Sequence, residues 1–190
     1  MFELKYATPP EWAACVVESM EKFLPDHAAA EKKASGMAMG MISHYPDRRE
    51  LVLSMIDLAI EELSHYRAVV RLMDERGLRL LPDEKDPYVN RMRGAIRHGR
   101  DLYFMDRLLV GGIVEARGAE RFGLVADALP DGDLKRFYRS IARSEKNHQG
   151  LFIELAERYF SPVDIRDRLE ELLWIEAEIV KELPIRPALH

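Results

Sequence analysis

The sequence contains a single cysteine, Cys15, among its 190 residues. One cysteine cannot form a disulfide within the chain, and it cannot build the cysteine clusters that hold zinc or iron–sulfur centres. We therefore expect a protein of a reducing compartment, the cytoplasm. Any metal site must be made from other side chains.

Long hydrophobic runs are also missing. The first residues, Met1 to Tyr6, lack the basic start and apolar run of a signal peptide, and no stretch of 18 consecutive apolar residues occurs. These two absences predict a soluble protein that does not use a membrane. Strand-like alternation is not sustained anywhere in the chain, which favours an all-α fold.

The chain as a whole has no excess of positive charge, but one stretch of it does. The formal net charge is −5, which argues against a generally basic nucleic-acid-binding protein. Residues 91–146 nevertheless carry 12 Lys and Arg against 8 Asp and Glu. This stretch is either a solvated helix face or a contact surface for an anionic partner.

Helical periodicity covers most of the chain, and its breaks coincide with proline and glycine. Residues 1–190 are long enough for one domain with a substantial core, so we expect a single domain. Pro25 is expected to end a first helix that starts near Pro10, and Asp26 to cap a second. The stretch 78–90 is expected to be mostly loop. The helices predicted after Pro25 cover approximately 27–43, 48–76, 101–128, 133–160 and 162–182.

Two tetrapeptides of the form Glu-x-x-His lie inside these helices, Glu62 to His65 and Glu145 to His148. Residues three apart are neighbours on one face of a helix, so each tetrapeptide directs a carboxylate and an imidazole to one point. Each motif supplies half of a metal site.

A further glutamate precedes each motif in the preceding helix. Glu31 lies 31 positions before Glu62, and Glu115 lies 30 positions before Glu145. One Glu from each of two helices and a Glu-x-x-His from each of two others is the pattern of ferritin-like di-iron and di-manganese bundles. The predicted metal ligands are Glu31, Glu62, His65, Glu115, Glu145 and His148.

Other acidic and histidine residues compete for these roles. Glu61 is also in helical reach of His65, but the match with the second motif favours Glu62. Glu120 lies between Arg117 and Arg121, where an exposed ion pair is the natural interpretation, so Glu115 is preferred. His27, His44 and His98 lie near helix ends or in polar segments and are expected at the surface.

Three segments of the chain resemble the MiaE family of tRNA hydroxylases: Asp26 to Ala34, Glu61 to Tyr66, and Glu145 to His148. The resemblance extends over essentially the whole chain. It implies a ferritin-like four-helix bundle with additional N- and C-terminal helices. It also implies a monooxygenase that uses two iron ions, dioxygen and an external electron donor.

The substrate is implied by the resemblance alone: the isopentenyl side chain of 2-methylthio-N6-isopentenyladenosine in the anticodon arm of tRNA. No Gly-rich dinucleotide motif or cysteine cluster is present, so the electron donor is expected to be a separate reductase. The basic stretch would then contact tRNA phosphates. The residues assigned to this contact are Arg91, Arg93, Arg97, Arg100, Lys135, Arg136, Arg139 and Arg143.

Several functions share this scaffold, because a fold does not determine an activity. The alternatives are an iron-storage or ferroxidase protein, a peroxide-removing protein of the manganese catalase or rubrerythrin kind, and a quinone-type di-iron hydroxylase. The last would need an apolar membrane-docking helix, whereas the final predicted helix contains many glutamates, which anionic lipid repels.

Overall fold

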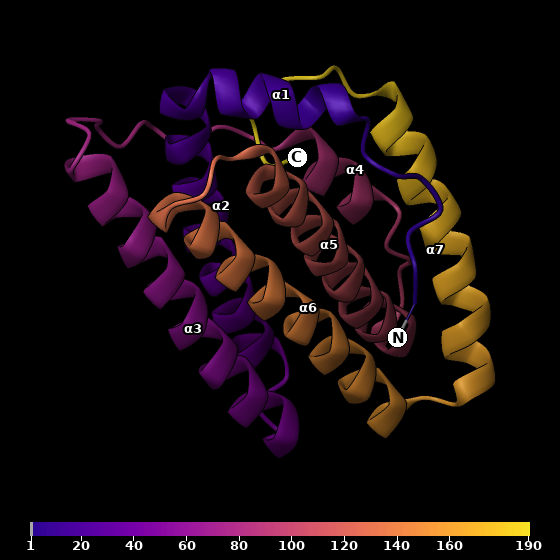
Figure 1. Ribbon diagram of the computed structural model, residues 1–190. Coiled ribbons are helices and arrows are strands. Elements are labelled where there is room, and N and C mark those ends of the chain that lie inside the picture. Colours follow the sequence, from indigo (N-terminus) through magenta and orange to yellow (C-terminus); the bar gives the residue numbers. More distant parts are fainter. Residues whose placement is uncertain (1) are drawn as a thin grey trace. The chain divides into compact units, whose positions relative to one another are not determined.

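The computed structural model describes residues 2–190, and this part of the chain contains only helices and loops. The predicted all-α class is therefore confirmed (Figure 1). The helices are α1 (Pro10–Glu18), α2 (Met20–His44), α3 (Arg49–Asp74), α4 (Pro87–Gly94), α5 (Arg100–Ala128), α6 (Asp133–Tyr159) and α7 (Pro162–Glu182).

The helices fall into two compact units. One comprises Cys15–Glu84 with Arg186–Leu189, and the other comprises the chain up to Ala14, Lys85–Ile185 and His190. The single domain expected from the length stays a prediction.

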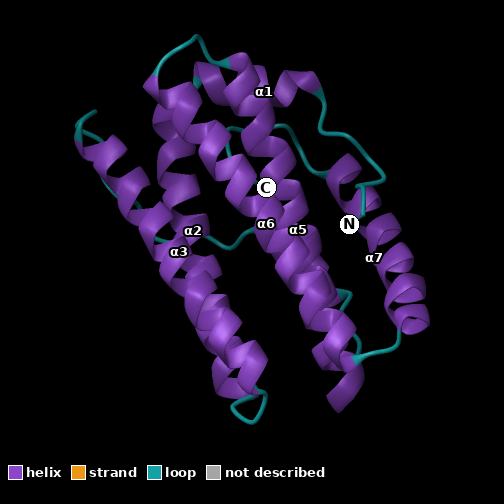
Figure 2. Cartoon of the chain, turned by 60° about the horizontal axis from the view of Figure 1, so that its bottom comes forward, coloured by secondary structure: helices purple, strands orange, loops and turns teal. Residues whose placement is uncertain are grey.

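The first unit is built on the hairpin of α2 and α3, which lie side by side (Figure 2). The turn between them contains Pro46, and the backbone N–H of Tyr45 caps α2 by donating to the carbonyl of Met41 at 3.0 Å. Ser35 Oγ donates to the carbonyl of Ala59 at 3.0 Å and ties the two helices together. The apolar core of the hairpin includes Phe23, Leu24, Ala28, Ala38, Met41, Leu51, Met55, Leu58, Val69 and Met73.

The prediction that Pro25 ends a helix is wrong, because α2 continues through it. The break between the first two helices lies at Ser19 instead. Pro25 is in the second turn of α2. Because proline has no N–H, the carbonyl of Glu21 lacks its usual helical hydrogen bond, and Glu21 lies in the exposed first turn. Asp26 is therefore no helix cap, and its carboxylate accepts a hydrogen bond from Leu189 N at 2.6 Å.

The second unit is built on the hairpin of α5 and α6. Gly111 and Gly112 allow the two helices to approach, because a Cβ added at Gly111 would lie 2.8 Å from the ring of Phe152 on α6. The Phe152 side chain occupies the space that side chains at these two positions would fill. Close packing here sets the spacing between Glu115 on α5 and the Glu-x-x-His motif on α6.

Buried ion pairs attach the other segments of this unit to α5. Arg117 on α5 donates through Nε to Glu176 of α7 at 2.8 Å, and both side chains are fully buried. Tyr88 of α4 donates to the same carboxylate at 3.1 Å. Farther along α5, buried Asp106 accepts hydrogen bonds from Arg97 at 2.7 Å and from Arg168 of α7 at 2.7 Å.

Helix α4 was not predicted, because its residues were assigned to a loop and a short basic segment. It begins with Pro87 in the first turn, and the Asp86 side chain accepts a hydrogen bond from Val89 N at 3.1 Å. Tyr88 and Met92 are its buried side chains, and the helix packs on α5 and α7. A helix this short shows too little periodicity in the sequence to be recognised.

Candidate metal centre

The α2–α3 hairpin places Glu31, Glu62 and His65 together. His65 Nδ1 lies 3.5 Å from Glu31 Oε2 and 3.8 Å from Glu62 Oε2. Both carboxylates are buried, with 3% and 1% of the side chain exposed. Each of the three residues offers a ligand atom within 4.8 Å of the others, so this hairpin could hold a metal ion as one half-site.

A fourth residue, His27, completes this half-site and corrects the prediction that it lies at the surface. Its side chain is fully buried, and Nε2 lies 2.6 Å from Glu31 Oε1. The prediction was wrong because α2 extends through Pro25, which puts His27 one turn before Glu31 on the same buried face. His27 bonds to the Glu31 oxygen that does not face His65, and this hydrogen bond orients the Glu31 carboxylate.

The carboxylates change the protonation of His65. Burial lowers its pKa, but the hydrogen bonds and charges of Glu31 and Glu62 outweigh this effect and raise the pKa to about 10. Without a metal, His65 is therefore a cation between two carboxylates. A bound cation would replace that proton, since a histidine ligand must be neutral.

The α5–α6 hairpin forms the second half-site from Glu115, Glu145 and His148. His148 Nδ1 lies 3.6 Å from Glu145 Oε2 and 4.0 Å from Glu115 Oε2. All three side chains are buried, and each offers a ligand atom within 4.8 Å of the others. The same donors at the same spacing therefore recur in both units.

The competing glutamates do not join these groups. Glu61 is half exposed and lies 3.9 Å from His65 Nε2, whereas Glu62 is buried. Glu120 pairs with Arg117, as predicted, and also accepts hydrogen bonds from Thr8 at 2.9 and 2.7 Å. The expected exposure of this pair is wrong, because Arg117 is fully buried and Glu120 is only 25% exposed.

The donor set of each half-site fits iron or manganese. Carboxylates are hard anionic ligands that can bridge two cations, and imidazole suits iron. Buried carboxylates this close together repel one another, at a cost of several kcal/mol unless a proton or a cation compensates. The chemistry of the side chains, Glu with Glu-x-x-His in each unit, is therefore that of a carboxylate-bridged metal centre.

Some of the predicted tRNA-contacting residues lie at opposite ends of α5, whereas Arg91 and Arg93 are on α4. Arg97 and Arg100 lie where α5 begins, whereas Arg139 lies 3.7 Å from Asp127, where α5 ends. A helix of 29 residues spans roughly 40 Å at 1.5 Å per residue. The two groups of basic residues are therefore far apart within this unit.

The basic residues also differ in how they are engaged. Arg97 is held by Asp106, Arg91 pairs with Glu182 at 2.6 Å, and Lys135 donates to the carbonyl of Leu129 at 3.0 Å. Arg136 pairs with Asp133 in the first turn of its own helix. Arg93, Arg100 and Arg143 are exposed and form no ion pair with any described residue.

Sequence reasoning did not assign Lys146 to this surface. It is exposed on α6 at the spacing that continues the row of Arg136, Arg139 and Arg143, so all four lie on one helix face. Arg143 and Lys146 line a cleft of ≈ 670 Å³ with the N-terminal residues Phe2 to Ala7. The helical spacing alone was sufficient to find this residue.

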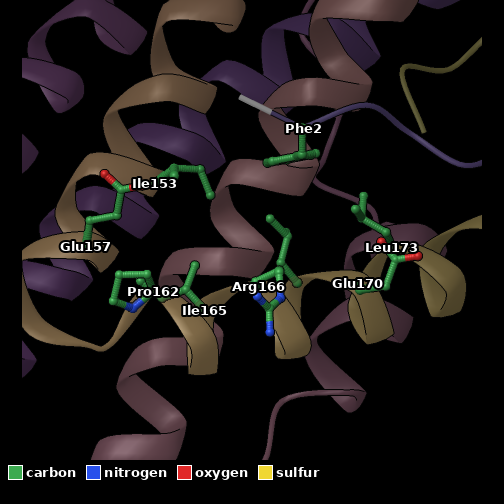
Figure 3. Close-up of a pocket in the computed structure, with 9 residues that line it drawn as sticks. Phe2, Ile153, Glu157, Pro162, Ile165, Arg166, Glu170 and Leu173 are labelled. Carbon is green, nitrogen blue, oxygen red and sulfur yellow. The ribbon is translucent and has the colours of Figure 1, made fainter.

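A smaller cavity of ≈ 290 Å³ lies between the N-terminal segment, α6 and α7 (Figure 3). Its wall is largely apolar and includes Phe2, Ile153, Ile165 and Leu173. None of the predicted metal ligands lines it. Helices long and apolar enough to cross a membrane are not found among residues 2–190.

The helical architecture and the carboxylate–histidine groups define the class first: this is a ferritin-like fold of the di-iron carboxylate type. The chain belongs to the family described as tRNA-(MS[2]IO[6]A)-hydroxylase (MiaE), whose model matches residues 2–190. The family expected from the sequence motifs is thereby confirmed.

Individual relatives agree with the family. The chain is 34% identical over 174 residues to the tRNA 2-(methylsulfanyl)-N(6)-isopentenyladenosine(37) hydroxylase of Pseudomonas putida, covering 92% of this chain and 84% of that protein. It is 34% identical over 156 residues to the protein of the same name from Salmonella typhimurium, covering 82% of this chain and 57% of that protein.

A solved structure is similar over the full length. It is described as protein 43 with aldehyde deformylating oxygenase activity from Synechococcus. The TM-score is 0.94 at 32% sequence identity, and the match covers 100% of this chain and 96% of the other. The ferritin-like fold predicted from the sequence is confirmed by this likeness.

Proposed function

We propose that this protein is a di-iron monooxygenase that hydroxylates the isopentenyl side chain of 2-methylthio-N6-isopentenyladenosine in tRNA. The observation that carries the proposal is the family match over residues 2–190. It is supported by two buried half-sites whose donor atoms suit iron. Because tRNA is its substrate, we also infer that the protein works in the cytoplasm.

We propose that the two half-sites act together, in one domain, as the ligands of two iron ions. Glu31, Glu62 and His65 would supply one half and Glu115, Glu145 and His148 the other, as in the di-iron carboxylate pattern. When bound, the iron pair would supply activation of dioxygen for insertion of one oxygen atom into a C–H bond. The overall reaction consumes dioxygen, two electrons and two protons, and it releases water with the hydroxylated product.

The protein's own side chains hold and orient the ligands. His27 fixes the Glu31 carboxylate by its hydrogen bond at 2.6 Å. Burial of the glutamates keeps bulk water from competing for the ligand atoms. The electrons are proposed to come from a separate reductase, because the single cysteine cannot build an iron–sulfur cluster in this chain.

We propose that the exposed row Arg136, Arg139, Arg143 and Lys146 on α6 contacts tRNA phosphates. Its members share a face and lead toward Glu145 on the same helix. Arg97 is a poorer candidate, because Asp106 already holds its guanidinium. For Arg91, Arg93, Arg100 and Lys135 the tRNA contact stays a prediction.

The function is tested by incubating purified protein with iron, a reducing system, dioxygen and tRNA that carries the isopentenyl group, followed by mass spectrometry of the nucleosides. We expect a gain of one oxygen atom on the side chain. Glu62→Ala and His148→Ala should each lose at least one of two bound iron ions and the activity. Glu61→Ala, a matched change at the exposed neighbour, should keep both.

Other outcomes would identify the alternatives. Iron oxidation and accumulation without a hydroxylated nucleoside would support a storage protein, and rapid loss of peroxide would support a peroxidase. Consumption of an aldehyde, with the tRNA left unmodified, would indicate an activity like that named for the Synechococcus protein. Zinc alone at one ion per chain would contradict the di-iron assignment.

The tRNA surface is tested separately from the metal. The triple variant Arg136→Ala/Arg139→Ala/Arg143→Ala should bind tRNA more weakly while its iron content stays the same. Each lost phosphate contact should lower the slope of log K against log salt by about 0.7 to 0.9. The control Arg76→Ala/Arg79→Ala, in the other unit, should change neither. Equal affinities and equal salt slopes in the triple variant and the parent would show that tRNA does not contact this helix face.

A further inference from the structure

Helix α3 carries an apolar row on the side opposite its metal ligands. Leu53 is 52% exposed, Ile56 39%, Ile60 59% and Leu63 50%. The residues that α3 buries, such as Leu58 and Glu62, lie on its other face. Within residues 15–84, α3 packs on α2. A contiguous row of large apolar side chains in water marks an interaction site.

The row belongs to a longer pattern with the spacing of a coiled-coil seam. Intervals of four and three residues alternate without a break from Arg49 to Asp74, over roughly 38 Å of helix. This average period of 3.5 is the one with which two helices keep a seam in contact. The positions of the seam are Arg49, Leu53, Ile56, Ile60, Leu63, Arg67, Val70 and Asp74.

The seam maps onto itself when the helix is reversed. Antiparallel pairing of two such helices puts Ile60 opposite Leu63 and Leu53 opposite Val70, so apolar side chains meet at the centre. At the ends, Arg49 meets Asp74. Each of these contacts occurs twice in a symmetric pair, because both helices present the same residues.

The charges select this orientation. Arg49 and Asp74 are exposed, and neither forms an ion pair with another described residue. Antiparallel pairing gives each an opposite charge. It also puts Arg67 opposite Ile56, with Asp57 of the other helix as the neighbouring carboxylate. Parallel pairing would instead place Arg49 on Arg49 and Asp74 on Asp74, which is repulsive. The pattern is therefore self-complementary in one orientation.

We propose that the seam of α3 is a docking surface for a second copy of this chain, with the two α3 helices antiparallel about a two-fold axis near residues 61 and 62. The surface is distinct from the metal ligands, which face the other side of α3. The proposal therefore stands independently of the proposed function.

Sedimentation equilibrium on the full chain over a wide concentration range tests the proposal. The parent protein should form dimers. Ile60→Glu puts two like charges near the two-fold axis, and the dissociation constant should rise by roughly 100-fold or more, since it leaves charge buried without a partner. The control Leu81→Glu changes a leucine that is 64% exposed but lies outside the helix, and it should leave the constant unchanged.

Charge swaps then test the orientation. Arg49→Asp and Asp74→Arg should each weaken the dimer by about tenfold, because both end pairs become repulsive. The double variant should return to within about threefold of the parent. Circular dichroism would confirm that the helices remain intact.

The proposal fails if the parent is monomeric at all concentrations, or if Ile60→Glu leaves the dissociation constant unchanged. Single swaps without effect would contradict the antiparallel pairing. Loss of binding to lipid vesicles or to tRNA in Ile60→Glu, with no change in mass, would show that another partner occupies the seam.

Discussion

In the α2–α3 hairpin the residue one turn before the first glutamate ligand is His27, whereas in the α5–α6 hairpin it is Gly111. His27 bonds directly to Glu31 at 2.6 Å. Gly111 has no side chain, and the ring of Phe152 fills the space beside it. The same ligand set is therefore positioned by a hydrogen bond in one hairpin and by close helix packing in the other.

The two units also differ in how they are stabilised. The unit of α5 and α6 is held together by buried ion pairs, of which Arg117–Glu176 and Asp106–Arg168 connect α5 to α7. In the other unit the buried pairs, His27–Glu31 and His65 with Glu31 and Glu62, all involve the predicted metal ligands. The pair Lys32–Asp83 is exposed, and exposed pairs add little to stability. Apolar packing, and the metal when bound, must therefore contribute more to the α2–α3 hairpin.

The largest effect on stability is expected from Glu176→Ala. It removes the fully buried carboxylate that pairs with Arg117 and leaves only the partly exposed Glu120 as its partner, and breaking a buried pair in this way costs up to about 3 to 5 kcal/mol. Urea unfolding measures the loss. The double variant Arg117→Met/Glu176→Leu should recover most of it, because neither member of the pair is then left buried without the other. A loss below about 1 kcal/mol in Glu176→Ala would contradict the role of the ion pair.

His27→Phe tests the hydrogen bond that only the first hairpin has at this position. Phenylalanine keeps the apolar ring contact with Phe23 but cannot bond to Glu31. Iron affinity should fall by about 10- to 100-fold, as expected when a partner of a ligand is lost. Competition with a chelator measures it, and His44→Phe, at an exposed histidine of the same helix, is the control. Unchanged affinity would show that Glu31 does not need His27.

Glycine substitutions compare the packing of the two hairpins directly. Gly111→Ala should destabilise by about 1 to 3 kcal/mol, because its methyl group meets the Phe152 ring. Gly36→Ala in α2, where a Cβ meets nothing within 4 Å, should stabilise by up to about 1 kcal/mol. Thermal unfolding reads both effects. A change in stability of the same sign in both variants would contradict the difference in packing between the two hairpins.

The smallest effect is expected from Asp86→Asn. This variant tests how the stability of the unit built on α5 and α6 changes at acidic pH. Burial raises the pKa of Asp86, but His190, at 3.0 Å, and the backbone N–H groups of α4 outweigh it and lower the pKa to about 2. Stability from this carboxylate is therefore present above pH 3.8 and lost as the pH falls toward 2.

The variant should be less stable than the parent at pH 6 by on the order of 1 kcal/mol, since Asn keeps the cap but not the charge. The difference should shrink between pH 4 and pH 2. A constant difference over this range would show that the charge of Asp86 is not what stabilises α4.

The helices and the two half-sites could be predicted because they depend on local geometry. A Glu-x-x-His spacing within a helix brings Glu62 to His65 and Glu145 to His148 whatever surrounds them. The glutamates at matched distances, and the preference for Glu62 over Glu61, followed from the repeat of the pattern. Family membership could be predicted from the same segments.

Other features were decided by contacts between residues far apart in the chain. A proline inside a helix usually interrupts it, yet α2 continues through Pro25. This continuation places His27 on the buried face beside Glu31. Helix α4 depends on the contact of Tyr88 with Glu176, which lie 88 positions apart.

The sequence by itself determined which residues share a helix face, because the helical repeat is a property of the backbone. Only the tertiary structure decided which charged side chains are buried. Arg117 and Arg168 look like surface residues in the sequence, but Glu176 and Asp106 hold them in the interior. A charge leaves water only when a partner and packed neighbours compensate its desolvation, and those partners come from distant segments.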